Sequence, residues 1–282
     1  MKNPLIDYYR EKEIYVKLPT KGTWYKNKPN LTPDGELGIL PMTLKDEMLF
    51  KIPDSLYNGE SMYEVIRSIA PDIVDPFEVS IPDVDVILLA SRAISSNEEM
   101  TVDARCPVCK KTASYSINIP SMLSKVIVNT EETEIEIRKL KIRLRPNTLA
   151  AVTASSIQSV ENNRILHILS LKKNDENRDH AEFKKLMEKS LEVATAATIG
   201  LLADNVASIE LPDGTIVDNI ENIVEWIVNS DSATINILKK HAVKLNDNGL
   251  PKSFPFTCDN DECNHTFESG IEFNPTFFFI AK

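Results

Sequence analysis

Alternating polar and apolar positions predict short strands in several parts of the chain. Residues 100–105 and 110–119 alternate on either side of a short break, and residues 266–273 alternate in the same way farther along. The Asp213-Gly214 pair is expected to form the turn between two further strands. Other strands are expected at residues 13–19, 36–41, 133–137 and 140–144, with a turn at residues 32–35.

Apolar residues that recur every three or four positions predict helices. The clearest pattern runs from His180 to Leu201, and its alanine-rich second half would let a neighbouring helix approach closely. We expect it to pair with an antiparallel helix over residues 149–169, for which Asn147 is the expected N-cap. Other helices are expected at residues 42–52, 61–70, 83–95 and 218–228, and from about residue 232.

Two local signals refine this pattern. The alternation in residues 133–137 changes phase in residues 140–144, which predicts a bulge or a bend near Lys139. Asp218, with Glu221 three residues later, has the arrangement of a capping box at the start of a helix.

Four cysteines lie in two close pairs that are far apart along the chain. Cys106 and Cys109 are separated by two residues, and Cys258 and Cys263 by four. Either spacing lets one turn direct two thiolates at one ion, and two such turns complete a tetrahedral zinc shell. We therefore predict that these four cysteines hold a structural zinc ion. His265 could replace Cys263 as a ligand or could support a cysteine sulfur through a hydrogen bond.

Other interpretations of the cysteines fit less well. A redox Cys-x-x-Cys motif opens a helix, whereas both pairs here precede strand-like segments, as in the hairpins of a zinc ribbon. Disulfides would need an oxidising compartment, and residues 1–7 lack the apolar core of a signal peptide. A catalytic zinc ion is disfavoured, because four protein ligands leave no position for water. Free thiols remain an alternative.

These patterns together predict an α+β fold with three modules. Residues 1–99 form an N-terminal mixed α/β module. Residues 100–120 and 251–282 form the two halves of a split zinc-ribbon-like module, and residues 121–250 form a mainly helical insert between the cysteine pairs. A chain of 282 residues, 42% of them hydrophobic, is long enough to bury a core of this kind.

Charge and hydropathy exclude two classes of partner. The net charge is −10, and the second cysteine pair carries Asp259, Asp261 and Glu262, so binding to a nucleic-acid backbone is disfavoured. The longest apolar stretch, residues 193–203, reaches only about half the length that spans a bilayer, so membrane insertion is not expected.

The chain carries no recognisable catalytic motif. Its eight glycines form no phosphate loop, and it has neither a G-x-S-x-G nor an H-E-x-x-H sequence. The four histidines are scattered, and most carboxylates are expected on solvated faces. We therefore expect a protein that is not an enzyme.

Both ends of the chain resemble a known family. Residues 18–25, 35–47 and 56–59 resemble the opening of the baseplate hub and hub assembly proteins of T4-like contractile-tail bacteriophages. Residues 254–258, 263–267 and 271–278 resemble the close of the same family, and residues 106–109 extend the likeness to the middle of the chain. The insert from about residue 147 to 250 carries no matching motif.

The resemblance implies a non-enzymatic structural or assembly protein of the baseplate hub. Its partners would be other hub or tail proteins, and it would occupy the host cytoplasm during assembly and then the tail baseplate of the virion. A zinc-ribbon adaptor or a transcription-associated interaction module is the alternative, and a zinc-dependent hydrolase or deaminase is a distant third.

The C-terminal residues are rich in phenylalanine. Phe273, Phe277, Phe278 and Phe279 would either close over the core or anchor a partner, since aromatic residues concentrate binding energy at interfaces. With the helical insert they are the predicted partner-binding elements, and self-association into a homo-oligomer is a further expectation.

Overall fold

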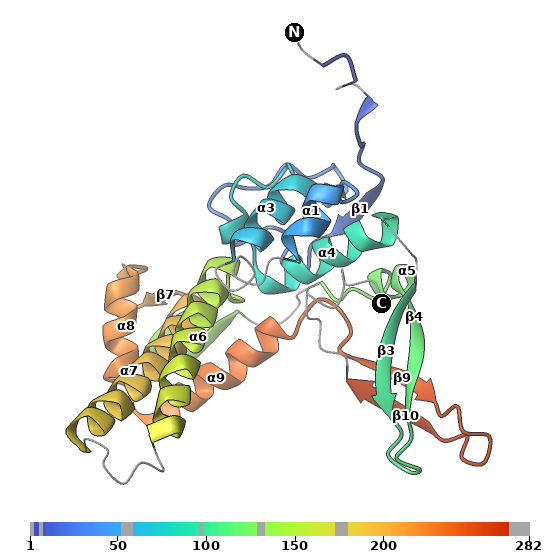
Figure 1. Cartoon of the computed structure of the whole chain (residues 1–282). Helices are drawn as coiled ribbons and strands as arrows, with labels where there is room; N and C mark the ends of the chain where they lie inside the picture. Colours follow the sequence, from blue (N-terminus) through green and yellow to red (C-terminus); the bar gives the residue numbers. More distant parts are fainter. Residues whose placement is uncertain are drawn as a thin grey trace. The chain divides into compact units, whose positions relative to one another are not determined.

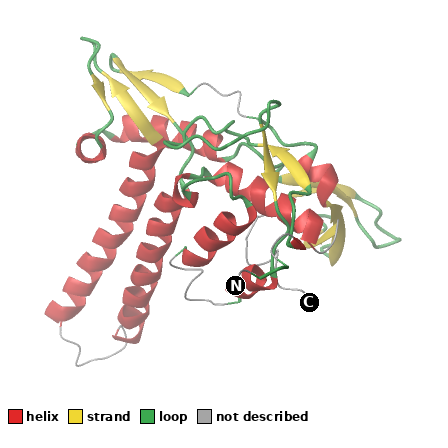
Figure 2. Cartoon of the chain, turned by 90° about the horizontal axis from the view of Figure 1, so that it is seen from above, coloured by secondary structure: helices red, strands yellow, loops and turns green. Residues whose placement is uncertain are grey.

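The computed structural model describes residues 3–5, 8–51, 59–95, 99–128, 133–172 and 180–270. It is a mixed α+β structure, as predicted (Figures 1 and 2). The chain forms two compact units. The first unit comprises Met1–Ile52, Ser61–Asn129 and Asp247–Lys282, and the second comprises Pro53–Glu60 and Thr130–Asn246. The three-module division with boundaries after residues 99, 120 and 250 stays a prediction.

The N-terminal part of the first unit is built around a buried helix. Helix α4 (Ile81–Ser95) has apolar residues on most of its sides, and its residues from Pro82 to Ser91 are buried with a single exception. Strand β1 (Ile14–Lys17) pairs antiparallel with β2 (Glu36–Ile39). The remaining elements here are α1 (Leu44–Leu49), α3 (Glu60–Ile69) and the 3-10 helix η2 (Pro76–Glu78).

Short sequence signals determine where these elements begin. The predicted turn is present, because Gly35 adopts a φ of 76° and its N–H donates to the Thr32 carbonyl at 2.8 Å. Helix α1 begins with a capping box in which Thr43 and Asp46 bond each other's backbone N–H groups.

A buried carboxylate joins α4 to the preceding loop. Asp83 is fully buried and accepts hydrogen bonds from the Thr20 N–H at 2.9 Å and the Tyr25 hydroxyl at 2.6 Å, as well as from the Thr20 hydroxyl. Burial raises the pKa of Asp83 to about 6, although these three hydrogen bonds lower it. The expectation that carboxylates lie on solvated faces is wrong for this residue.

Two β-hairpins complete the first unit. Strand β3 (Glu99–Arg105) pairs with β4 (Thr112–Asn118), and β9 (Ser253–Thr257) pairs with β10 (Thr266–Gly270), both antiparallel. The short helix α5 (Ile119–Leu123) follows β4, with Asn118 as its N-cap. Each hairpin turn contains one of the cysteine pairs, as the alternation of residues predicted.

The second unit contains a four-stranded antiparallel sheet with the order β5-β6-β7-β8. Its strands are β5 (Glu134–Ile137), β6 (Leu140–Leu144), β7 (Val206–Glu210) and β8 (Ile216–Val217). The phase change near Lys139 is a two-residue hairpin turn, in which Arg138 and Lys139 adopt φ values of 49° and 69°. The register shift lies instead at Arg143 and Leu144, opposite β7.

Four helices accompany this sheet. Helices α6 (Leu149–Lys172) and α7 (His180–Asn205) form the predicted antiparallel pair, seen as the two long helices in Figure 2. Helices α8 (Ile220–Val228) and α9 (Ser232–Asn246) pack their apolar faces against β6, β7 and the end of α7. In the part of the chain that the structure describes, no helix combines the length and apolar character needed to cross a membrane.

Both predicted helix caps are displaced by one residue. Thr148, not Asn147, accepts a hydrogen bond from the Ala151 N–H at the start of α6. Asn219, not Asp218, caps α8. In each pair the neighbouring polar residue satisfies the same short-range rule, so spacing alone could not choose between them.

Asn147 has a different role, in a polar cluster around Asp204. It exchanges two hydrogen bonds with Asn246 of α9, at 2.7 and 2.8 Å, and donates to the Leu201 carbonyl of α7. The Asp204 carboxylate accepts from the Thr148 N–H at 2.7 Å and from the Arg145 guanidinium at 2.8 Å. The start of α6 is thereby bonded to the ends of α7 and α9.

We expect Asp204→Ala to lower the free energy of unfolding by about 2–4 kcal/mol, because it removes the carboxylate partner of a mostly buried guanidinium and the acceptor of a helix N–H. Glu210→Ala is the matched control. It removes the exposed ion pair with Lys141 and should cost under about 1 kcal/mol. Denaturant unfolding measures both, and equal losses would contradict the assigned role of Asp204.

The buried Asp83 should make stability depend on pH. Its pKa of about 6, against an ordinary 3.8, means that the folded state binds the proton more tightly than the unfolded state. Relative to Asp83→Asn, the wild-type protein should therefore gain about 2–3 kcal/mol as the pH falls from 7 to 4. Unfolding curves of both proteins over this range test this, and a difference that does not change with pH would refute it.

Candidate metal centre

The first cysteine pair lies in the turn between β3 and β4. Cys106 directly follows β3, and its N–H donates to the Lys111 carbonyl at 2.9 Å. The Lys110 N–H donates back to the Cys106 carbonyl at 3.1 Å, and Lys110 adopts a left-handed φ of 64°. This tight turn brings Cys109 back beside Cys106.

The second pair repeats the arrangement with two more residues. The Cys258 N–H donates to the His265 carbonyl at 3.0 Å, just as Cys106 bonds Lys111. Asn260 accepts from the N–H groups of Cys263 and Asn264 at 2.8 and 3.0 Å. Asn264 has a φ of 42° and therefore occupies the position that Lys110 has in the first turn. The two turns present their sulfur atoms in the same way although they differ in length.

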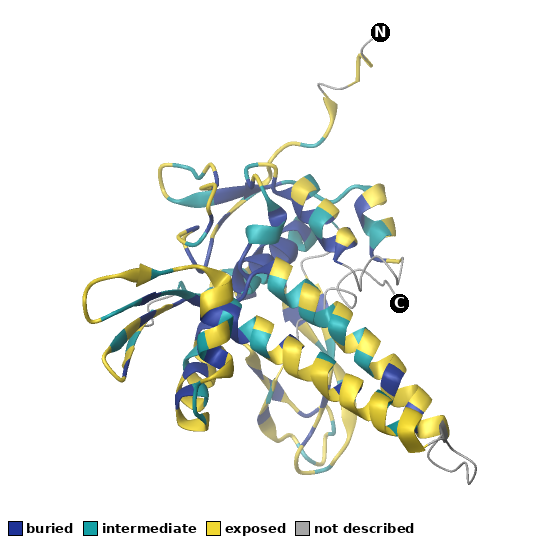
Figure 3. Cartoon of the chain, turned by 90° about the vertical axis from the view of Figure 1, so that its left-hand side faces the viewer, coloured by how far each residue is buried: buried dark blue, intermediate teal, exposed yellow. Residues whose placement is uncertain are grey.

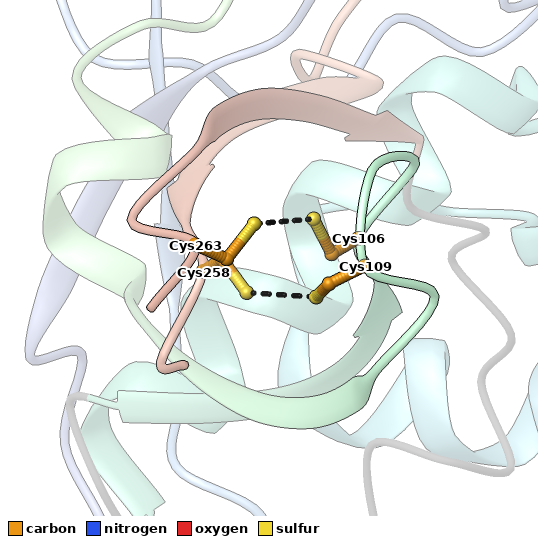
Figure 4. Close-up of side chains that lie close together, drawn as sticks. All are labelled: Cys106, Cys109, Cys258 and Cys263. Carbon is orange, nitrogen blue, oxygen red and sulfur yellow. Dashed lines mark hydrogen bonds between the residues drawn. The ribbon is translucent and has the colours of Figure 1, made fainter. Parts of the chain in front are cut away.

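The four sulfur atoms converge on one point (Figure 4). The Sγ atoms of Cys106 and Cys263 are 3.9 Å apart, and those of Cys109 and Cys258 are 3.4 Å apart. All four lie within 4.8 Å of one another. A tetrahedral ion with metal–sulfur bonds of about 2.3 Å places its sulfur atoms about 3.8 Å apart. The donor set therefore fits a tetrahedral metal ion.

The same distances distinguish a metal site from disulfides. A disulfide needs sulfur atoms about 2.0 Å apart, and all four cysteines are free thiols. Cys106 and Cys258, the first residue of each pair, are buried, while Cys109 and Cys263 are partly exposed. An ion at the centre would thus be shielded from solvent on one side.

The thiols of Cys109 and Cys258 differ in pKa. A hydrogen bond from the Lys111 N–H lowers the pKa of Cys109 to about 7. The Asn260 N–H acts in the same direction on Cys258, but burial and the three neighbouring thiols raise the pKa of Cys258 to about 12. A divalent ion would favour the thiolate form of all four ligands.

An aromatic cluster joins the two hairpins beside the sulfur atoms. The ring of Tyr115 on β4 lies 4.8 Å from that of Phe256 on β9 and meets the ring of Phe267 on β10 edge-on at 6.1 Å. Phe256 and Phe267 are partners in the β9–β10 register. Lys111 and Asp259 also form an ion pair of 3.3 Å between the two turns. Nothing in the sequence showed that these rings would meet.

His265 does not belong to the sulfur group. Its side chain is exposed, and its backbone carbonyl, not its imidazole, closes the second turn. The predicted roles of His265 as a substitute ligand or as support for a sulfur stay predictions. Phe273, Phe277, Phe278 and Phe279 lie outside the described residues, so their predicted contacts also stay predictions.

Comparison with known proteins gives one result. A protein-family model described as T4 bacteriophage base plate protein matches residues 17–279. This range includes both cysteine pairs and the helical region between them. Neither the curated proteins nor the solved structures yield a match.

We predict that the chain purified under reducing conditions, without chelators, contains one metal ion. Cys109→Ser and Cys258→Ser should each abolish metal binding and expose the amides of β9 and β10 to hydrogen exchange, because a two-stranded hairpin is marginal by itself. Elemental analysis and exchange mass spectrometry measure these effects.

The matched control is His265→Ala, which should keep the ion if the four sulfur atoms suffice. Loss of the ion in this variant would make the imidazole a ligand. A wild-type chain that holds no ion would refute the metal centre itself.

Proposed function

The chain belongs to the T4 bacteriophage base plate protein family, and from this we propose that it is a structural or assembly protein of the central hub of a contractile-tail baseplate. The family match over residues 17–279 carries the proposal. The hub assignment rests on the resemblance of residues 18–25, 35–47, 254–258 and 263–267 to hub proteins of T4-like phages.

We propose that the metal is zinc and that it is structural. Four thiolates suit zinc and fill its tetrahedral shell, so no position is left for a water nucleophile or a substrate. Binding of zinc to such a site can contribute on the order of 10 kcal/mol to ordering a small module. A contribution of this size would keep the β3–β4 and β9–β10 hairpins together when the particle is loaded mechanically.

The acidic character of the second turn argues against the alternative of a nucleic-acid adaptor. Asp259, Asp261 and Glu262 lie beside the sulfur group, and the nearby Lys111 is already paired with Asp259. A phosphate backbone needs an uncompensated basic surface. A protein-binding zinc-ribbon adaptor remains the second candidate, because its fold would use the same paired hairpins.

The proposed partners are other hub or tail proteins. Helices α6 and α7 are mostly exposed along their outer halves (Figure 3), and together with Phe277, Phe278 and Phe279 they are the proposed contact elements. The proposed location is the host cytoplasm during assembly and the baseplate of the virion afterwards.

We expect mass spectrometry of purified virions of the encoding phage to detect the chain at a constant ratio to other baseplate proteins. A phage carrying Cys258→Ser should yield fewer complete tails, since the joint between the hairpins is lost, whereas His265→Ala should not. Absence from virions together with loss of tails would indicate an assembly factor. A chain that is absent from virions, and whose Cys258→Ser variant still yields complete tails, would contradict the proposal.

A further inference from the structure

A buried hydroxyl lies unpaired where the two hairpins meet. The hydroxyl oxygen of Tyr115 on β4 is shielded from solvent, yet it forms no hydrogen bond with any residue that the structure describes. A hydroxyl that has left water without gaining a partner is unfavourable, and buried polar groups in native proteins are rarely left in this state. The position of Tyr115 therefore calls for a partner that can use the hydroxyl.

The ring contacts of Tyr115 place its side chain beside the second cysteine turn. The ring lies 4.8 Å from that of Phe256 on β9. Phe256 and Cys258 are two positions apart and are both buried, so they lie on the same face of this extended segment. Tyr115 thus packs on the face of the second hairpin that continues to the Cys258 sulfur.

The electrostatic surroundings of the hydroxyl agree with this placement. Burial raises the pKa of Tyr115, whereas the Asp259 N–H lowers it. Negative charge on Cys258, and to a smaller extent on Asp259 and Cys106, raises it further. Cys106 and Cys258 are the two buried members of the sulfur group. The hydroxyl therefore lies on the buried side of that group, where Cys258 leads into Asp259.

The sulfur atoms are the best acceptors among these neighbours. A tyrosine hydroxyl has one proton to donate and lone pairs with which to accept. The Asp259 N–H is itself a donor, so it can serve only a lone pair of the hydroxyl oxygen. The Asp259 carboxylate is half exposed and already paired with Lys111, whereas the hydroxyl is buried.

A bound cation would make the sulfur a better partner. A thiol sulfur accepts hydrogen bonds only weakly, but a divalent ion keeps its sulfur ligands in the charged thiolate form. Hydrogen bonds to charged acceptors are shorter and stronger than those to neutral ones. The Asn260 N–H already bonds the Cys258 sulfur, and a metal-bound thiolate has a further lone pair for a second donor.

We propose that the Tyr115 hydroxyl donates a hydrogen bond to the Cys258 sulfur of the metal centre and is a positioning residue for the bound ion. Groups that bond to metal ligands orient them and tune the metal, and this bond would hold a buried thiolate toward the ion. One side chain would then link the metal ion to the aromatic cluster between the hairpins. The proposal rests on the metal centre proposed above and not on the hub role.

Tyr115→Phe tests the proposal, because it removes the hydroxyl and keeps the ring. Loss of a group that bonds a metal ligand typically weakens metal binding by roughly 10- to 100-fold. The Kd of the full chain for Zn²⁺, measured by competition with a chromophoric chelator, should therefore rise about tenfold, or about 1.4 kcal/mol.

A second measurement separates this bond from simple packing. In the cobalt(II)-loaded chain, the sulfur-to-cobalt charge-transfer band should move to longer wavelength in Tyr115→Phe. A thiolate that has lost a hydrogen bond gives up electron density more readily, so the transition needs less energy. A general loosening of the hairpins would weaken binding without this shift.

Tyr63→Phe is the matched control. The Tyr63 ring lies 4.7 Å from that of Phe77 at a tilt of 36°, close to the 4.8 Å and 33° of Tyr115 and Phe256. Tyr63 belongs to α3 and lies outside both hairpins. Its variant should keep the Kd within about twofold of the wild-type value and leave the cobalt band in place, and circular dichroism should show that both variants keep the fold.

Three results would overturn the proposal. Unchanged affinity and an unchanged cobalt band in Tyr115→Phe would do so while leaving the metal centre itself intact. Weaker binding with an unmoved band would make Tyr115 a packing residue alone. A wild-type chain that binds neither ion would remove the metal centre and this hydrogen bond together.

Discussion

The fold of the first unit depends on four sulfur atoms reaching one point. Cys109 and Cys258 are 149 positions apart, yet their sulfur atoms lie 3.4 Å from each other. A two-stranded hairpin is only marginally stable by itself, so each hairpin needs the other. The aromatic contacts of Tyr115 with Phe256 and Phe267 bury apolar surface between the hairpins, and the sulfur group fixes which turns lie together. Together they hold in one unit two segments that are separated along the chain by Thr130–Asn246 of the second unit.

Buried polar groups join distant segments within each of the two units, as the sulfur atoms join the two hairpins. Asp83 ties the loop that contains Thr20 and Tyr25 to α4. Asp204 ties the starting turn of α6 to the end of α7. In each case a carboxylate accepts hydrogen bonds from a segment that is distant along the chain.

Local chemistry made much of this predictable. The spacing within each cysteine pair indicated a tight turn, and the alternating residues beside each pair indicated a hairpin. The predicted gathering of Cys106, Cys109, Cys258 and Cys263 is confirmed. Long-range chemistry was not predictable. Asp83 and Asp204 are indistinguishable in sequence from solvated carboxylates until the chain brings Tyr25 and Arg145 to them. The caps were misplaced by one residue because adjacent polar residues carry the same signal.

The insertion of the second unit into the first sets an order of events during synthesis. The ribosome releases residues 130–246 before Cys258 and Cys263 exist, so the second unit can fold while the first still lacks its last hairpin. Closing a loop of this length costs only about 2 kcal/mol more than closing a fifteen-residue loop, and a prefolded second unit shortens the effective distance. All four ligands are therefore present only once synthesis has passed Cys263, and products truncated before Cys258 lack the second pair.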